Sequence, residues 1–500
     1  MRRRRRSDPP RLRAAAPLLG LLALAAALRL PGLDYGLPFP LLSPDERSLV
    51  PRAWELGNGG GWDPGWYDYP SLLLTLLAPL QALFDEPSYG AARAVAAAVG
   101  LAGVAAAWWL GRVAYGAAAG LVAGAACAVA TVHVLYSHMA VTDVLLTTLA
   151  TVCLALLVTG RLEWAGAAAG LAASAKYPGV LLALPLLLAG RREPRRLAAA
   201  AALAVAAFAL TSPFVLLHAG EAWEDVRRVQ ALAADGWLGF EHDPPAPLAF
   251  GLRLWESLGP FLAVALAGLA LALTSLVLKQ HKAFGSRPAA RFGRVDVDFV
   301  LKQHKVSSAR ADLVLVLFAL VWYGHLLTVD AHFDRYVLPL VPVLGALAGR
   351  MRPLAPLALA LLLVPLWWSV GEVRELTRTD TRLVAHAWIE RHVPPDALVA
   401  VEPSAPPLGP RPTLALELPG PGFPTDPNRD LDVLRRAGVD YVLVTGAVAD
   451  RVLAAAERYP AEARLYARLE EEAKRVLHVR PGGELAGPWV AVYDLTPPVG

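Results

Sequence analysis

Long apolar runs, separated by short polar segments, fill the first three quarters of this 500-residue chain. A helix needs about 20 residues to cross ~30 Å of hydrocarbon, and many of the runs approach that length. Only 18% of the residues are charged, whereas a soluble protein carries roughly a quarter. The sequence therefore predicts a polytopic, mainly α-helical membrane protein and excludes a large soluble enzyme.

The first expected crossing is the apolar run 14–30, which follows a basic N-terminus at residues 1–13. No small-x-small cleavage site precedes the next polar stretch, so we interpret this run as a transmembrane helix and not as a secretory signal. The arginines before it place the N-terminus in the cytoplasm, by the positive-inside rule. Further crossings are expected at residues 92–110, 117–135, 143–160, 198–214, 259–278, 313–329, 336–348 and 354–370.

Two apolar segments do not fit a simple crossing. Residues 71–84 are too few for one, which suits an interfacial or re-entrant helix. Residues 165–189 have arginines on both flanks, so we expect a hairpin whose arms of about 12 residues turn near Lys176. A single tilted crossing with an inverted charge rule is the alternative. Counting two arms gives about eleven segments and an extracytoplasmic C-terminus.

The remaining sequence divides into loops and one further domain. Residues 31–70 and 218–257 are expected as extracytoplasmic loops, and residues 279–310 as a basic cytoplasmic loop that carries one copy and part of another of the hexapeptide VLKQHK. We have no physical account of this repeat. From residue 371 the composition is that of a soluble protein, and residues 14–370 form the predicted membrane domain.

Alternating helix-like and strand-like runs predict that residues 371–500 form a small extracytoplasmic α/β domain. Its expected helices are residues 383–392, 431–436, 450–458, with Asp450 as N-cap, and 464–475. Its expected strands are residues 397–401, 439–444 and 489–495, the second of them a buried strand of the parallel kind.

Four positions outside this domain carry charges where the predicted topology meets the outer face. They are the pair Asp45–Glu46 after the first crossing, Asp143 at the start of an apolar run, Lys176, and Arg335. Each has an ordinary explanation: a solvated acidic pair, a helix N-cap, or an interfacial cation that snorkels. Together they suit a reaction at a lipid-linked phosphate, because a carboxylate can take the acceptor proton while Lys and Arg stabilise charge on the phosphate.

Five motifs, in order, resemble those of the polyprenol-phosphate-sugar-dependent glycosyltransferases of the GT-C superfamily. The resemblance is to the family 39 and 83 types, the protein O-mannosyltransferases and the bacterial enzymes that modify lipid A with aminoarabinose. The motifs are Leu28-Arg29-Leu30 with Asp45-Glu46, Tyr69-Pro70-Ser71-Leu72, Ala140-Val141-Thr142-Asp143, the segment from Gly170 to Tyr177, and the segment from Arg335 to Pro342.

The resemblance implies a GT-C fold and an inverting transfer of sugar from a polyprenyl-phosphate donor to an acceptor hydroxyl on a glycan, lipid or protein. It implies Asp45 as general base, with Glu46 orienting the acceptor or Asp45. Asp143 would position the donor sugar or the acceptor.

The same resemblance implies that Lys176 and Arg335 contact the lipid phosphate, with Tyr336 hydrogen-bonding there. These residues require no metal: two acids on different loops could bind one, but no cluster at ligand spacing enforces it. His133, His138 and His332 are expected in the core or at the interface.

Other classes of function are less consistent with the sequence. The charges are too balanced, 47 basic against 43 acidic residues, to argue for a nucleic-acid partner. A transporter or flippase of a lipid-linked sugar predicts polar groups at mid-membrane depth and repeated halves, which are not apparent. A membrane anchor for a binding domain would not need about eleven segments.

Overall fold

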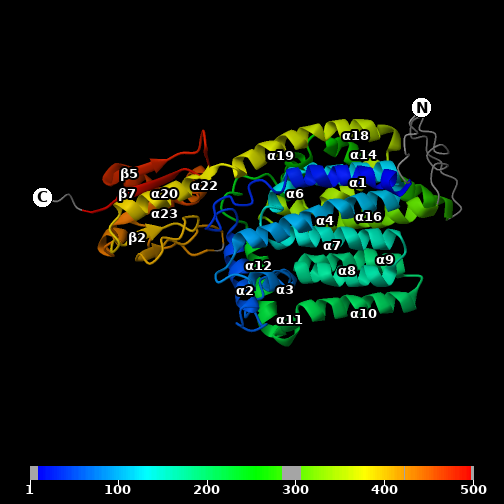
Figure 1. The fold of residues 1–500 in the computed structure, drawn as a ribbon, viewed down its shortest axis with the longest axis horizontal. Coiled ribbons are helices and arrows are strands. Elements are labelled where there is room, and N and C mark those ends of the chain that lie inside the picture. Colours follow the sequence, from blue (N-terminus) through cyan, green and yellow to red (C-terminus); the bar gives the residue numbers. More distant parts are fainter. Residues whose placement is uncertain (1–9, 284–305, 422, 497–500) are drawn as a thin grey trace, which may run out of the picture.

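The protein, described here from a computed structural model, joins a helical bundle to an α/β domain along one long axis (Figure 1). The structure describes residues 10–283, 306–421 and 423–496. The bundle helices run roughly along this axis, and the α/β domain lies beyond one end of them. All functional residues considered below lie at or near this junction.

The bundle combines long helices with short and broken ones. Five described stretches are long and apolar enough to cross a membrane: Tyr89–Tyr115, Pro194–Thr211, Phe261–Lys279, Ala309–Leu326 and Arg352–Leu376. The bundle elements are α1 (Pro10–Ala27), α4 (Tyr89–Tyr115), α5 (Ala117–Val129), α6 (Thr131–Tyr136), α7 (Thr142–Val158), α8 (Leu162–Ala175), η1 (Tyr177–Leu182), α9 (Ala183–Gly190), α10 (Pro194–Thr211), α14 (Phe261–Ala283), α16 (Val306–Leu326), η2 (Asp334–Val337), α17 (Leu340–Gly349), η3 (Arg352–Leu354), α18 (Ala355–Leu361) and α19 (Leu363–Leu376).

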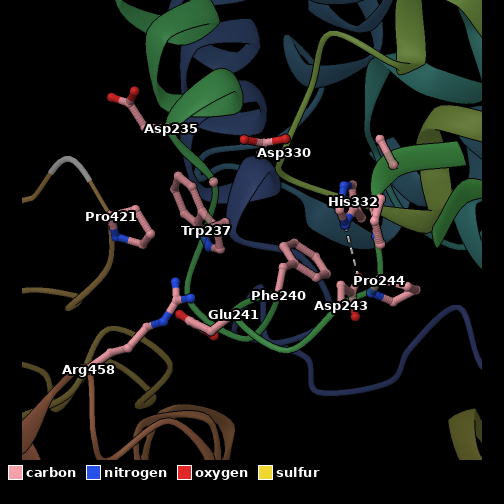
Figure 2. A pocket seen from close by; sticks show the side chains of 13 residues that line it. Asp235, Trp237, Phe240, Glu241, Asp243, Pro244, Asp330, His332, Pro421 and Arg458 are labelled. Atoms are coloured by element: carbon pink, nitrogen blue, oxygen red, sulfur yellow. Dashed lines mark hydrogen bonds and ion pairs between the residues drawn. The ribbon is translucent and has the colours of Figure 1, made fainter. Parts of the chain in front are cut away.

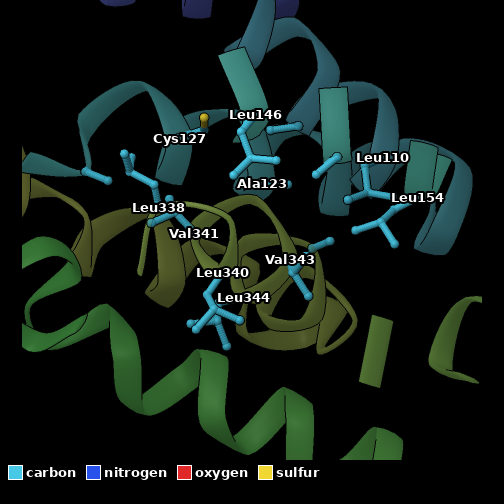
Figure 3. Close-up of a cluster of buried hydrophobic side chains, with 14 of the residues drawn as sticks. Leu110, Ala123, Cys127, Leu146, Leu154, Leu338, Leu340, Val341, Val343 and Leu344 are labelled. Atoms are coloured by element: carbon cyan, nitrogen blue, oxygen red, sulfur yellow. The ribbon is translucent and has the colours of Figure 1, made fainter. Parts of the chain in front are cut away.

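The short helix α17 lies at the centre of the bundle core, and every one of its residues is buried. Leu340, Val341 and Leu344 are among the side chains that Figure 3 shows in this core. A Cβ on Gly349 would lie 2.4 Å from the Cα atom of Ala119 in α5. Small residues therefore allow the two backbones to approach closely, as in other membrane helix pairs.

The predicted hairpin between residues 165 and 189 is confirmed. Helix α8 ends at Ala175 and the chain turns at Lys176 into η1 and α9. A Cβ on Gly179 would lie 2.4 Å from the carbonyl carbon of Ala172, and one on Gly190 would lie 2.8 Å from the Leu162 side chain. The last residue of α9 thus lies beside the first residue of α8, so the two arms are antiparallel and Lys176 occupies the tip.

The two loops predicted to be extracytoplasmic contain more helix than their Gly-, Pro- and Trp-rich sequences suggested. The first holds α2 (Pro44–Gly57), followed by the short helix α3 (Leu72–Gln81). Pro44 opens α2, and Asp45 and Glu46 lie in its first turn, where the helix dipole favours carboxylates. The second loop holds α12 (Ala219–Asp235) and α13 (Ala246–Leu258), and the short helix α11 (Pro213–Leu217) directly precedes it. In the predicted cytoplasmic loop, residues 284–305, including the second hexapeptide copy, lie outside the described residues.

The C-terminal domain is built on a five-stranded mixed sheet in the order β3-β2-β4-β7-β5. β2 pairs in parallel with both β3 and β4, and β7 is antiparallel to β4 and β5. Helix α19 runs past residue 370 and leads into this domain. Its elements are β1 (Thr379–Asp380), α20 (Thr381–His392), β2 (Val399–Val401), β3 (Thr413–Ala415), α21 (Leu431–Arg436), β4 (Tyr441–Thr445), α22 (Gly446–Ala454), α23 (Pro460–Glu472), β5 (Lys474–Val479), β6 (Leu485–Ala486) and β7 (Val490–Asp494).

Two local predictions for this domain are wrong. Asp450 is not an N-cap, because α22 begins directly after β4 with Thr445 as its cap, and the Asp450 carboxylate accepts a hydrogen bond from Trp489. The helix expected at 464–475 ends at Glu472, and Lys474 and Arg475 instead open strand β5. Pairing with β7 across the sheet overrides the local helical preference of these residues.

Close packing of α8 against α10 gives a first test. A Cβ on Gly170 would lie 2.1 Å from the Ala204 carbonyl oxygen, whereas one on Gly324 in α16 would meet nothing within 4 Å. We expect Gly170→Ala to lower the thermal unfolding midpoint in detergent, because overpacking costs about 1–3 kcal/mol. The matched variant Gly324→Ala should leave the midpoint unchanged or raise it. Equal midpoints for the two variants would contradict the α8–α10 contact.

Candidate active site

The first ion pair of the site joins residues 290 positions apart. A guanidinium nitrogen of Arg335, in η2, lies 2.5 Å from Oδ2 of Asp45, in the first turn of α2. The Tyr69 hydroxyl donates to the same carboxylate oxygen at 3.3 Å. Both charged side chains are largely buried yet retain some exposure, 23% for Asp45 and 15% for Arg335. The ion pair is therefore mostly shielded from water, but part of each side chain is still accessible to a bound molecule.

The second ion pair joins Lys176, at the tip of the α8–α9 hairpin, to Asp143, in the first turn of α7. Their Nζ and Oδ1 atoms lie 2.6 Å apart. The N-cap of α7 is Val141, so Asp143 does not serve as the N-cap that its sequence position allowed. The turn of the hairpin places Lys176 beside the start of α7, where it pairs with Asp143, a partner that was not predicted from the sequence.

Aromatic rings connect the two pairs into one cluster. The Lys176 ammonium lies 5.6 Å from the ring centre of Tyr69 and 5.4 Å from that of Tyr336, both within cation–π range. Tyr69 also touches the first pair through its hydroxyl, and Tyr336 lies below the Arg335 guanidinium at 5.8 Å. The structure thus brings together five of the six predicted site residues: Asp45, Asp143, Lys176, Arg335 and Tyr336.

Two polar atoms within this cluster are buried without hydrogen-bond partners in the described part of the chain. They are Oδ2 of Asp143, an acceptor, and Nε of Arg335, a donor. Buried polar groups of native proteins are nearly always paired, with protein or with bound molecules. An acceptor and a donor of this kind suit a substrate that carries both hydroxyl groups and an anionic oxygen.

Glu46, the sixth predicted site residue, points away from the cluster. Its carboxylate accepts two hydrogen bonds from Arg93 in α4, at 2.9 and 2.8 Å, and both side chains are fully buried. One of its oxygens also accepts from the backbone N–H of Ala140 at 2.9 Å. Through these hydrogen bonds Glu46 connects α2 to α4 and to the segment that precedes Asp143. Arg93 was not among the predicted site residues, although a lone arginine at the edge of an apolar run could have indicated a buried ion pair.

The next residue of α2, Arg47, contacts the C-terminal domain. Its guanidinium donates to the carbonyl oxygens of Pro403 and Ala405 at 2.8 and 3.0 Å, just beyond the end of β2. Arg382 of the same domain donates to the Leu41 carbonyl oxygen at 2.8 Å. The C-terminal domain is thus hydrogen-bonded directly to the helix that carries Asp45.

Asp334, which was not among the predicted site residues, holds the backbone of Arg335 in place. The Asp334 carboxylate accepts a hydrogen bond from the Arg335 backbone N–H at 2.8 Å and from the Tyr136 hydroxyl at 2.7 Å. In the sequence, the position of Asp334 directly before Arg335 could have indicated this contact. Asp334 therefore fixes the start of η2, and with it the direction of the Arg335 side chain.

The three histidines singled out in the sequence are buried, as expected. His133 contacts the buried guanidinium of Arg29 at 2.9 Å, and Arg29 also donates to the Cys127 and Ala128 carbonyl oxygens near the end of α5. Across the described ranges, no group of three or more His, Cys, Asp or Glu side chains is placed to hold a metal ion.

The charges of the cluster determine the ionisation of Asp45. Burial by itself would raise the pKa of this carboxyl group, but the positive charges of Arg335 and Lys176 outweigh burial and hold the pKa below its ordinary value. Asp45 is therefore ionised at neutral pH as long as both cations remain beside it.

Comparison with known proteins gives one family match and several similar structures. Residues 66–292, a little under half of the chain, match the family model of Glycosyltransferase family 87, whereas the sequence motifs resembled families 39 and 83. ArnT from Cupriavidus metallidurans, in the apo state, matches with 15% identity over 96% of this chain and 98% of ArnT, with a TM-score of 0.54. No curated protein matches the sequence significantly.

Two further solved structures extend this comparison. ArnT bound to undecaprenyl phosphate gives the same coverage at 16% identity, with a TM-score of 0.54. The Archaeoglobus fulgidus oligosaccharyltransferase in its apo form matches with 12% identity over 90% of this chain and 72% of the other, with a TM-score of 0.53. The predictions of a GT-C fold and of a membrane glycosyltransferase are confirmed.

The buried Glu46–Arg93 pair gives a second test. Removing one charge from such a pair leaves the other uncompensated, which costs about 3–5 kcal/mol. We therefore expect Glu46→Gln to lower the thermal unfolding midpoint strongly. Glu163→Gln, which breaks a partly exposed pair with Arg196, is the control and should have little effect. If the two variants unfold at comparable temperatures, the buried ion pair of Glu46 with Arg93 does not stabilise the protein more than the partly exposed pair does.

The depressed pKa of Asp45 predicts how its contribution to stability depends on pH. A carboxylate whose pKa is lower in the folded state stabilises the protein above its unfolded pKa of about 3.9, and this contribution is lost as the pH falls through the folded value. The difference in unfolding midpoint between wild type and Asp45→Asn should therefore be constant from pH 8 to pH 5. A difference that halves within this range would contradict the assigned ion pair.

Proposed function

We propose that the protein transfers a sugar from a polyprenyl-phosphate donor to an acceptor hydroxyl, with inversion at the anomeric carbon. The observation that carries this proposal is the convergence of Asp45, Asp143, Lys176 and Arg335 in one cluster, from four segments far apart in the sequence. The acceptor hydroxyl must lose a proton, which a carboxylate can take. The donor phosphate gains negative charge as the bond to the sugar breaks, and nearby cations can stabilise that charge.

Lys176 and Arg335 would stabilise the leaving group. The donor is a phosphodiester with one negative charge, and breaking the bond between the anomeric carbon and the phosphate oxygen releases a phosphomonoester with a second charge. Fixed cations that face this developing charge lower the barrier. Nε of Arg335, which has no hydrogen-bond partner among the described residues, is one donor available for a phosphate oxygen, since another nitrogen of this guanidinium is held by Asp45.

Asp45 would act as general base. It would take the proton of the acceptor hydroxyl while that oxygen attacks the anomeric carbon on the face opposite the phosphate. When paired with Arg335, Asp45 is a weak base because its pKa is low. A donor phosphate that draws on Arg335 and Lys176 adds negative charge beside Asp45 and raises this pKa, so that donor binding itself would prepare the base.

The other two acids would position groups. Oδ2 of Asp143, which has no hydrogen-bond partner in the described residues, can accept a hydroxyl of the donor sugar while Oδ1 stays on Lys176. Glu46 has both oxygens occupied by Arg93 and Ala140, so it acts as a positioning residue for α2 and the Asp143 segment.

Two structural neighbours support the lipid part of the proposal. One ArnT structure contains undecaprenyl phosphate, and one structure of the Archaeoglobus fulgidus enzyme AglB contains dolichol phosphate with an inhibitory peptide. The AglB complex matches with 11% identity over 94% of this chain and 73% of the other, with a TM-score of 0.52. These ligands support a polyprenyl-phosphate donor for the same fold.

We further propose that the site faces the extracytoplasmic side, with the N-terminus in the cytoplasm, and that residues 14–370 and 371–500 form the membrane and outer domains. Arg191 and Arg192, which follow α9, lie at the end of the bundle opposite Lys176, because the arms of the hairpin are antiparallel. The positive-inside rule assigns such a basic end to the cytoplasm.

The transfer reaction tests the base directly. Membranes that contain the protein and its natural acceptor are supplied with polyprenyl-phosphate sugars labelled in the sugar, and label in the acceptor is measured. We expect Asp45→Asn to reduce transfer at least ~100-fold, as for loss of a general base, while binding of polyprenyl phosphate is retained. Asp85→Asn, on an exposed loop, is the matched control.

Unchanged transfer by the Asp45→Asn protein would remove the base assignment. If membranes with wild-type protein incorporate no label from any polyprenyl-phosphate sugar, the proposed donor is wrong. Movement of labelled donor across the bilayer without transfer would instead favour a flippase of a lipid-linked sugar.

A further inference from the structure

A cavity of about 330 Å³ lies outside the ion-pair cluster, where the second outer loop meets the C-terminal domain (Figure 2). Trp237 and Phe240 of the loop line it, together with Asp330 and His332 of the segment before η2. Arg458 lines it from the C-terminal domain. Concave sites between domains, with aromatic walls and a few polar groups, are typical ligand sites, and this volume is at the small end of their range of ~300–1,000 Å³.

Phe333 connects the aromatic wall of this cavity to the ion-pair cluster. Trp237 and Phe240 both pack against Phe333, with ring centres 5.9 and 4.9 Å apart. Phe333 in turn contacts Tyr336 at 5.7 Å and lies below the Arg335 guanidinium at 4.9 Å. A molecule in the cavity would therefore lie close to the cluster, across these rings, and would not displace the ion pairs.

The polar groups of the cavity are mostly acceptors. Asp235 and Asp330 have no side-chain hydrogen bond or ion pair with any described residue, whereas Asp243 is held by Arg253 at 3.0 Å. His332 is 5% exposed, its Nδ1 faces Asp243 at 3.2 Å, and its Nε2 is buried with no hydrogen-bond partner in the described ranges. Carboxylates accept hydrogen bonds and repel anions, so this cavity suits a molecule rich in donors and disfavours a phosphate.

We propose that the cavity binds a sugar residue of the acceptor, which makes the acceptor a glycan. A sugar ring combines the two features that the walls require: C–H groups that pack on the Trp237 and Phe240 rings, and hydroxyls that donate to Asp235 and Asp330. The inference rests on the proposed transfer reaction and assigns its acceptor class. It also gives the C-terminal domain a role, since Arg458 and Pro421 complete the wall.

The cavity suits the acceptor better than the donor. The donor phosphate needs the cations of the cluster, which lie beyond Phe333, while the cavity itself has four carboxylates, Asp235, Glu241, Asp243 and Asp330, against one arginine, Arg458. A sugar held here would extend from the outer loops toward Asp45, the proposed base. The attacking hydroxyl would then belong to the next residue of the same glycan.

Direct binding tests this proposal without relying on transfer. Purified full-length protein is titrated with methyl glycosides of common hexoses and pentoses, and binding is followed by saturation-transfer NMR. We expect at least one glycoside to bind, with affinity reduced at least tenfold in Trp237→Ala and in the double variant Asp235→Asn/Asp330→Asn. The double variant changes two exposed side chains, so it remains informative if Trp237→Ala fails to fold.

Two controls separate this site from the rest of the protein. Trp367→Ala changes a highly exposed tryptophan of α19 and should bind as wild type does. Asp45→Asn should lose transfer but keep glycoside binding, so failure of the proposed base and failure of the sugar site are distinguishable. The proposal is overturned if no glycoside binds the wild type, if the double variant binds all glycosides normally, or if only an organic cation such as ethanolamine binds at these residues.

Discussion

Charge pairing away from bulk water is the constraint on which the site of this protein depends. In a membrane-spanning bundle an ionic side chain is costly to bury unless it is paired with a side chain of opposite charge. Asp45 with Arg335, and Asp143 with Lys176, satisfy this requirement with groups from α2, η2, α7 and the α8–α9 hairpin. The same pairing that allows these residues to be buried also brings acids and cations together, which is the arrangement on which the proposed reaction rests.

Three consecutive residues of α2 serve three different neighbours. Asp45 faces Arg335, Glu46 is buried against Arg93, and Arg47 donates to the loop after β2 of the C-terminal domain. Because successive side chains of a helix are about 100° apart, one helical turn can contact the cluster, the bundle and the C-terminal domain at once. The position of Asp45 is therefore set jointly by the membrane helices and by the C-terminal domain.

Much of this arrangement could be predicted from the sequence. Arginines on both sides of residues 165–189 predicted the hairpin, because charge distribution constrains topology. Pro178 and Gly179, which favour a break in a helix, then placed its turn beside Lys176. The buried role of Glu46 could not be predicted, since its partner Arg93 lies in another helix and the pairing depends on tertiary packing. For the same reason the helix α2 was not expected within a loop rich in glycine and proline. Lys474 was assigned to a helix, but the pairing of β5 with β7 places it in a strand.

The central proposal is that the paired cations Lys176 and Arg335 receive the phosphate of a lipid-linked donor. A structure of the protein with a polyprenyl phosphate bound tests this most directly. We predict phosphate oxygens within hydrogen-bond distance of Lys176 Nζ and Arg335, with the Asp45 carboxylate turned from Arg335 toward the acceptor side. A phosphate bound elsewhere, with both ion pairs unchanged, would contradict the claim.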